Sequence, residues 1–344
     1  MTAFAERHAE LLAGYCLDVQ PGEQVVVHGG QGAAPLLLAL QRAILARDAW
    51  PLLRVALDEE LVLEGFAPLE LLEAETTDAT VRIISPANAN ALADVDPARI
   101  ARATRARGPL REAGSGRRWN VTLWPTPALA QQAGMGTTAF AALVARALFL
   151  DHDDPVAAWR GLRDRQQRLI ETLASASEIR IRAPGTDLVL DVAGRTWVNS
   201  DGKRNLPSGE VFTGPREDSA EGTVRFTIPS SPAGVDVAGV ELRFERGLVV
   251  DARAERGEAY LLETLATDPG ARRLGELGVG TNTGLDRPTG IILLDEKIGG
   301  TVHLALGRSY PETGGVNESA VHWDLICDLR ENGVLLADGA PIRV

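Results

Sequence analysis

The sequence predicts an N-terminal α/β domain with a mainly parallel sheet, followed by a C-terminal α+β domain with a mostly antiparallel sheet. Three observations predict this fold class. Short β-rich runs alternate with helical patterns in the first half, a long amphipathic segment begins at Pro155, and apolar residues alternate with polar ones from Glu178. A chain of 344 residues is long enough for two cores. We expect the domains to span residues 1–176 and 177–344.

The strands of the first domain are expected at four β-rich runs. They cover residues 24–28, 52–56, 80–84 and 119–124. An apolar helix begins at Pro35, where proline fits the first turn. Strands that alternate with helices are typical of a parallel sheet covered by helices.

The helix that begins at Pro155 repeats apolar residues on one face, as a helix linking two domains would, and we place the domain boundary near its end. Beyond it, Ile179 and Ile181, then Leu188 and Leu190, occupy every second position, which is typical of antiparallel strands. The other expected elements are a hairpin over 241–251, a helix over 258–266, and hairpin turns at Asn332 and Gly333 and at Asp338 and Gly339.

Composition excludes several classes of protein. The net charge is −12 and no basic stripe gathers the 35 Lys and Arg residues, which argues against a nucleic-acid partner. Cys16 and Cys327 lie far apart, so neither a disulfide framework nor a zinc knuckle is indicated. Charges near the N-terminus replace the apolar core of a signal peptide. The longest apolar stretch, 35–46, falls short of the ~20 residues of a membrane span. We expect a cytoplasmic protein with no membrane partner.

The chemistry of the chain is concentrated near the C-terminus, where His322 and Asp324 lie two residues apart in a strand-like run. Side chains at i and i+2 of a strand share a face, so this pair can offer a nitrogen and an oxygen to one metal ion. His303 alternates with Val302 and Leu304; if these two face the core, His303 faces the other side together with the small Ala305 and Gly307. The competing interpretation of His322 and Asp324 is a solvated strand face.

Carboxylates further upstream are candidate ligands too. Glu276 lies among glycines and apolar residues, where a carboxylate needs a cationic partner. Glu210 falls in a run with two prolines and two glycines, which predicts an irregular loop and allows a solvated acid. The run 295–297, Asp-Glu-Lys, is consistent with a surface charge cluster, and Tyr310 with core packing.

Other motifs are rejected. The glycine-rich turn at 29–32 has Pro35 where a dinucleotide loop needs its third glycine. The sequence contains no GxSxG elbow, no Walker loop and no HExxH helix. His8, His28 and His152 have no neighbouring ligand pattern and are interpreted as structural or surface residues.

Four segments in order resemble the M29 metallo-aminopeptidases, the family of aminopeptidase T and aminopeptidase S, which includes leucyl aminopeptidases. They are NLPSGEVFT at 205–213, LGELGVGTN at 274–282, DEKIGGTVHLALGRSY at 295–310 and NESAVHWD at 317–324. The resemblance covers the second half almost continuously and the first half only in general layout. The stretch between Tyr310 and His322 is shorter than in many members, which leaves the shape of the substrate pocket open.

The resemblance implies a homodimeric peptide hydrolase that holds two divalent ions, Zn, Co, Mn or Mg. Carried over by motif, Tyr310 lies beside the reacting carbonyl, and Glu296 is either a ligand or a supporting acid. The implied metal ligands are Glu210, Glu276, His303, His322 and Asp324.

Charge counting agrees with two ions, since three carboxylates bring −3 against +4 and a bridging hydroxide balances the rest. The hypothesis is that the ions activate a water that attacks a peptide with a free N-terminus. Glu276 or a nearby carboxylate then moves the proton, and Tyr310 donates a hydrogen bond to the oxyanion. One alternative is a mononuclear non-haem iron ring-cleaving dioxygenase on the same scaffold, and another is a non-catalytic binding protein.

Overall fold

A computed structural model describes residues 2–57 and 62–343. The chain divides into two compact units. The first contains residues 1–156 and 202–207, and the second contains residues 157–201 and 208–344. Helix α8 (Pro155–Leu173) begins where the units divide. The boundary expected at residue 176 lies at the other end of this helix.

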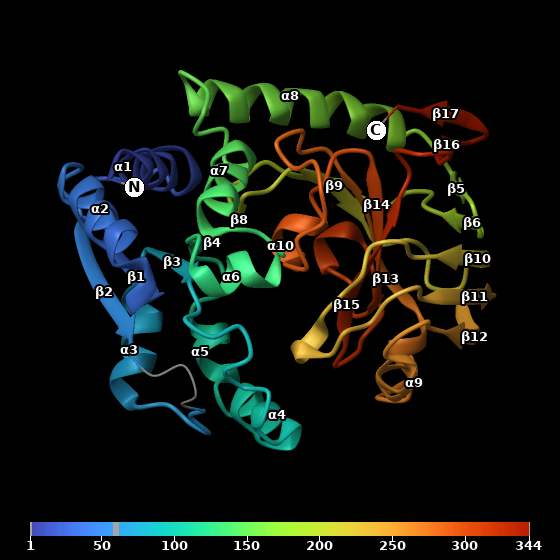
Figure 1. Cartoon of the computed structure of the whole chain (residues 1–344), viewed down its shortest axis with the longest axis horizontal. Coiled ribbons are helices and arrows are strands. Elements are labelled where there is room, and N and C mark those ends of the chain that lie inside the picture. The colour runs from blue at the N-terminus through green and yellow to red at the C-terminus, as the bar shows by residue number, and fades with distance from the viewer. Residues whose placement is uncertain (1, 58–61, 344) are drawn as a thin grey trace. The chain divides into compact units, whose positions relative to one another are not determined.

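The first unit is built on a parallel sheet with the strand order β2-β1-β3-β4-β8 (Figure 1). The sheet confirms the four predicted strands, which are β1 (Gln24–Gly30), β2 (Trp50–Ala56), β3 (Ala79–Ile84) and β4 (Arg118–Leu123). The fifth, β8 (Asn205–Leu206), comes from far along the chain. The helices are α1 (Thr2–Glu10), η1 (Leu11–Cys16), η2 (Gln31–Ala33), α2 (Ala34–Leu45), α3 (Pro68–Thr76), α4 (Pro97–Ala106), α5 (Gly108–Ala113), α6 (Pro127–Gln132) and α7 (Thr137–Ala147).

The strands of the second unit are antiparallel, as predicted, and they form two sheets rather than one (Figure 1). The larger has the order β12 (Leu248–Arg253), β11 (Glu241–Glu245), β10 (Glu221–Arg225), β6 (Thr186–Asp191), β5 (Glu178–Ala183), β16 (Val334–Ala337), β17 (Ala340–Ile342). The smaller has the order β15 (His322–Asp328), β14 (Thr301–Gly307), β13 (Leu274–Gly280), β9 (Glu210–Thr213), β7 (Val198–Ser200). The helices after α8 are η3 (Pro232–Gly234), α9 (Glu258–Leu265), η4 (Pro269–Arg272), α10 (Ile292–Asp295) and η5 (Pro311–Thr313).

Two of the predicted hairpins form at residues with left-handed backbone. Arg246 and Gly247 connect β11 to β12 with φ of 47° and 74°, and Asp338 and Gly339 connect β16 to β17 with φ of 45° and 82°. Positive φ at both central residues matches the twist of paired strands.

The third predicted hairpin, at Asn332 and Gly333, is wrong. Asn332 does turn with a φ of 60°, but it connects β15 of the smaller sheet to β16 of the larger sheet. A tight-turn pattern fixes the local backbone only. Whether the flanking strands pair depends on tertiary contacts that the pattern does not contain.

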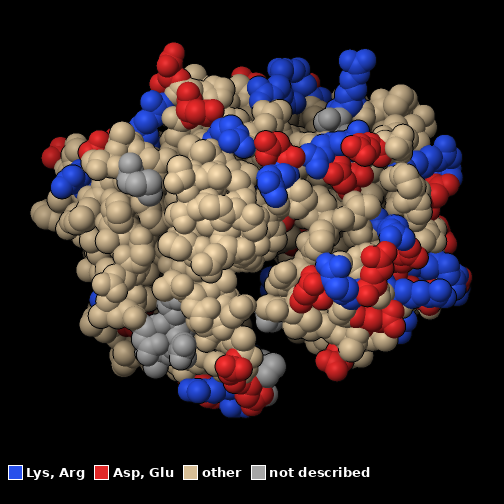
Figure 2. Space-filling model, in the orientation of Figure 1, with Lys and Arg blue, Asp and Glu red and all other residues tan. Residues whose placement is uncertain are grey.

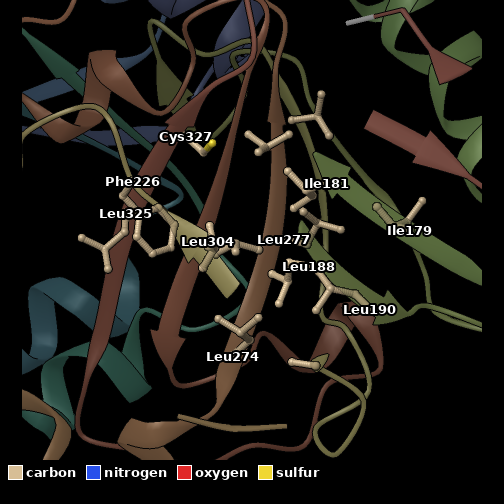
Figure 3. Packing of buried hydrophobic residues seen from close by; sticks show 14 of the residues in the cluster. Ile179, Ile181, Leu188, Leu190, Phe226, Leu274, Leu277, Leu304, Leu325 and Cys327 are labelled. Atoms are coloured by element: carbon tan, nitrogen blue, oxygen red, sulfur yellow. The ribbon is translucent and has the colours of Figure 1, made fainter. Parts of the chain in front are cut away.

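The core of the second unit lies where apolar residues of the two sheets meet (Figure 3). Leu277, Leu304 and Leu325 of the smaller sheet pack in one cluster with Ile181 and Leu188 of the larger sheet. Each of these leucines is at most 1% exposed, and burying such a side chain stabilises the fold by about 2 kcal/mol. Since alternate residues of a strand point to opposite faces, the other face of the smaller sheet is left for different side chains.

Within residues 2–57 and 62–343, no helix has both the length and the apolar character needed to cross a membrane.

Candidate metal centre

The five predicted ligands lie on one face of the smaller sheet, because the register of its strands aligns them. Residues directly opposite each other in antiparallel strands share a face. Glu276 of β13 lies opposite Ala305 of β14, and Ala305 lies opposite Asp324 of β15. The same register pairs Gly278 with His303, Gly307 with His322 and Gly280 with Glu210. The predicted orientation of His303, away from the core side of its strand, is confirmed.

Small residues on this face make room for the functional side chains. A Cβ at Gly278 would lie 2.0 Å from His303 Nε2, so any side chain there would displace the imidazole. Gly209, just before β9, has a φ of 115° and a position for Cβ only 2.8 Å from Asn282 Cβ. Its left-handed backbone and close approach both require glycine, and they bring Glu210 into the sheet.

Glu276 lies between the two histidines. Its Oε1 is 3.5 Å from His303 Nε2, and its Oε2 is 3.4 Å from His322 Nε2. Each carboxylate oxygen therefore faces a different imidazole. A carboxylate in this position can donate one oxygen to each of two ions.

The remaining two predicted ligands complete two groups of donor atoms. Glu210 Oε2 lies 3.4 Å from His303 Nε2, and Asp324 Oδ2 lies 3.7 Å from His322 Nε2. Within each group, all donor atoms lie within 4.8 Å of one another. The groups are Glu210, Glu276 and His303, and Glu276, His322 and Asp324.

Glu210 corrects two expectations. The predicted irregular loop contains the short strands β8 and β9, and Glu210 is only 4% exposed rather than solvated. The side-chain amide of Gln166, a buried polar residue on the apolar face of α8, donates a 2.5 Å hydrogen bond to the carbonyl oxygen of Glu210. The proline and glycine pattern indicates turns but not the strand pairing between them.

The expected surface cluster at 295–297 is also wrong. Asp295 is buried and accepts hydrogen bonds from the backbone of Thr289 and Gly290. Lys297 is buried as well, and its Nζ lies 2.5 Å from Glu210 Oε1 and 2.5 Å from Glu296 Oε1. Glu296 belongs to neither donor group. A signal for this burial is present in the sequence, because Lys297 follows two acids within one of the family motifs.

Tyr310 and His322 are held in relation to each other. His322 Nδ1 donates to the carbonyl oxygen of Arg308 across 2.8 Å, so its Nε2 faces the carboxylates. The Tyr310 hydroxyl lies 3.4 Å from that Nε2, and its ring packs edge-on against Phe212. The hydroxyl therefore lies at the edge of the donor cluster rather than in the apolar core.

The charges of the cluster shift the pKa of its members. Burial alone would lower the pKa of His303 and His322, but their contacts with Glu276 and the other carboxylates outweigh burial and raise both pKa values to about 9. Burial would raise the pKa of Glu276, yet the two histidines lower it to about 2. Burial, with the charges of Glu296 and Glu276, raises the pKa of Asp324 to about 7. Two protonated imidazoles thus balance carboxylates when no metal is bound.

The pKa shifts predict how pH affects the metal-free protein. Because the pKa of both histidines is higher in the folded protein, their protonation stabilises the fold. This stabilisation is complete below about pH 6.5 and is lost as the pH rises through about 9. The raised pKa of Asp324 acts in the same direction, since its protonated form is favoured up to about pH 7. Thermal unfolding with a chelator present should therefore give a lower melting temperature at pH 9 than at pH 6.5, and added metal should raise it more at pH 9. A metal effect that is equal at both pH values would contradict these shifts.

The residues present fit divalent metal ions. Buried Glu210 Oε2, which faces the donor group, has no hydrogen-bond partner in the described part of the chain. A buried carboxylate oxygen that accepts no hydrogen bond needs a nearby cation, either the protonated His303 at 3.4 Å or a bound divalent ion. Three carboxylates with two imidazoles are a donor set that Zn, Co, Mn and Mg all accept.

The fold is that of a metalloprotease, and the cluster offers donor atoms for metal ions. Residues 2–342 match the family described as thermophilic metalloprotease (M29), and the chain belongs to that family. The family predicted from the sequence is confirmed, and the match extends through the first half, where the motifs gave only a general likeness. The predicted enzyme class, a metal-dependent peptide hydrolase, is confirmed with it.

Several relatives are similar to this chain. Aminopeptidase 2 of Geobacillus stearothermophilus is 32% identical over 96% of this chain and 93% of its own length. Aminopeptidase T of Thermus thermophilus is 36% identical over 55% of this chain and 53% of its own length. The solved structure of wild-type AmpT from Thermus thermophilus superimposes with a TM-score of 0.84 at 26% identity, covering 98% of this chain and 96% of the other.

The solved structure of 2,5-dihydroxypyridine dioxygenase from Pseudomonas putida KT2440 also has a related fold. Its TM-score is 0.62 at 16% identity, with 100% of this chain and 95% of the other covered. A likeness at this identity concerns the fold alone.

Proposed function

We propose that the protein is an aminopeptidase that removes N-terminal residues from peptides and uses two divalent metal ions. The observation that carries the proposal is the position of Glu276, whose two carboxylate oxygens face His303 and His322 separately. A single ion would leave one of the two donor groups without a cation. The name of Aminopeptidase 2, which is similar over nearly the whole chain, supports the exopeptidase activity.

The residues that would hold the ions are Glu210 and His303 on one side, His322 and Asp324 on the other, and Glu276 between them. Glu296 is a further candidate, as a ligand or as an acid that supports one. Bound divalent ions would lower the pKa of a water molecule and polarise the scissile carbonyl. Zn, Co, Mn and Mg all suit these donors, and availability selects among them.

The side chains of the chain supply the remaining functions. Tyr310 donates a hydrogen bond from its hydroxyl to the oxygen of the tetrahedral intermediate. Burial and the charge of Glu276 raise the pKa of Tyr310, which keeps this hydroxyl protonated as a donor. For the proton that goes to the leaving amine we propose Glu276 or another carboxylate of the cluster, such as Glu296, which belongs to neither donor group. Acidic side chains near the site also favour a substrate with a positively charged α-amine.

The family resemblance further supports a homodimer with peptide substrates, without nucleic-acid or membrane partners. The two widely separated cysteines support a reducing compartment, for which we propose the cytoplasm.

The test of the proposed function compares leucyl-p-nitroanilide with its N-acetylated form. We expect cleavage of the first and a rate at least roughly a hundredfold lower for the second, because acetylation removes the positive charge of the α-amine and leaves only one N–H donor. The metal-loaded protein is the sample, and the chelated protein is its control. Equal cleavage of both compounds would exclude an aminopeptidase.

A further inference from the structure

Lys297 is a buried cation inside the carboxylate cluster. The residue is 1% exposed, and its ammonium lies 2.5 Å from one oxygen of Glu210 and 2.5 Å from one oxygen of Glu296. Its backbone is anchored on both sides, since its N–H donates to Leu294 and its carbonyl accepts from Asn282. The side chain is therefore directed into the cluster by a fixed piece of backbone.

The choice of lysine is unusual for this chain. Of the 35 Lys and Arg residues, only Lys203 and Lys297 are lysines. Exposed ion pairs of the second unit use arginine, such as Arg180 with Asp187, and charges of both signs are interspersed on its visible surface (Figure 2). A compact ammonium with three donors fits between two carboxylates, where a planar guanidinium needs more room.

The charges of the cluster explain why a cation is needed. Four carboxylates lie in the cluster, each partly or fully buried: Glu210, Glu276, Glu296 and Asp324. The contacts of His303 and His322 are with Glu276, Glu210 and Asp324, so among residues 2–57 and 62–343 Lys297 is the cation that contacts Glu296. Lys297 also occupies Glu210 Oε1, which leaves Glu210 Oε2 directed at the donor group of His303. An uncompensated buried carboxylate destabilises a folded protein strongly.

We propose that the ammonium of Lys297 compensates the negative charge of the carboxylate cluster. It thereby stabilises the folded, metal-free protein and holds Glu210 and Glu296 in position before metal binds. The inference rests on the metal centre of the proposed function. Lys297 is a positioning residue, because it acts through Glu210 and Glu296. Divalent ions held at the donor groups would supply the positive charge that Glu210 needs, so the contribution of Lys297 through Glu210 belongs mainly to the metal-free state.

The test is the melting temperature of Lys297→Met at pH 8, measured with a chelator and with saturating Co²⁺ or Mn²⁺. Methionine keeps most of the length of the side chain and removes the charge. We expect the metal-free melting temperature to fall by roughly 10 °C and the metal-loaded one by less than half of that. The matched control is Lys203→Met, which removes the other lysine, an exposed residue over the ring of Tyr15, and should change both values little.

A second variant separates charge from packing. Glu296→Gln combined with Lys297→Met removes one negative and one positive charge, so the double variant should recover part of the loss in the metal-free state, while Glu210 still lacks its ammonium partner. If Lys297→Met alone does not fold without metal, the double variant still tests the proposal, because it should fold without metal. The inference is overturned if Lys297→Met lowers both melting temperatures equally, or if the double variant recovers nothing. If metal does not raise the melting temperature of the unmodified protein, the proposed metal centre is rejected, and the role of Lys297 that depends on it is rejected too.

Discussion

Glu276→Gln is expected to lower the rate of peptide hydrolysis at least roughly a thousandfold, which corresponds to about 4 kcal/mol of transition-state stabilisation. Glutamine has nearly the volume of glutamate, so the packing of β13 should persist. It lacks the negative charge, and one of its two oxygens becomes an amide nitrogen that cannot bind a cation. The substitution therefore removes the donor of one group and leaves only a neutral amide oxygen for the other, because Glu276 is common to both groups.

The controls for this variant follow from the position of Glu276. The circular dichroism spectrum should match that of the unmodified protein, and the metal content should fall below two ions per chain. Glu263→Gln, at an exposed position on α9, is the matched control and should retain full activity. Activity of Glu276→Gln near that of the unmodified protein would exclude Glu276 from both proposed roles.

Tyr310→Phe should lower kcat by roughly a hundredfold or more while the metal content stays unchanged, because a single donor to the oxyanion contributes about this much. The hydroxyl lies 3.4 Å from His322 Nε2, and the phenylalanine ring keeps the packing against Phe212. The effect should therefore be on turnover rather than on folding or metal binding.

Tyr260→Phe is the matched control for Tyr310→Phe. Tyr260 packs edge-on against Trp323 outside the donor cluster, and the loss of its hydroxyl should leave kcat within about twofold. If Tyr310→Phe has unchanged kinetics, the Tyr310 hydroxyl serves packing alone.

Local patterns in the sequence predict much of the fold. Alternation of period two places Ile179, Ile181, Leu188 and Leu190 in paired strands, and the structure confirms it. The spacing of Trp159, Leu162, Ile170 and Leu173 identifies the buried face of α8. The same alternation predicts that His303 points away from the core side of its strand. These successes share a cause: side-chain periodicity reports burial directly.

The failures concern contacts between residues far apart in the sequence. Strand β8 is only two residues long and pairs with β4, more than eighty residues earlier, which no local pattern indicates. The hairpin predicted at Asn332 is wrong for the same reason: the turn is local, but its flanking strands pair in two different sheets. The burial of Lys297 follows from its partner Glu210, which lies in another motif. Charged residues in a row predict a surface unless the partner of each is known.

The candidate site was predictable because four motifs occur together in the order found in a known family. Each motif alone permits an ordinary interpretation, such as a solvated strand face for His322 and Asp324. The structure adds the register that brings them to one face and the central position of Glu276.

The most direct test of the proposed two-metal centre is the metal content per chain by elemental analysis, paired with leucyl-p-nitroanilide hydrolysis after chelation and after re-addition of Zn, Co, Mn or Mg. We predict about two divalent ions per chain, with hydrolysis lost on chelation and restored by metal. A single iron per chain without peptidase activity would contradict the two-metal aminopeptidase and would favour the dioxygenase chemistry of the related fold.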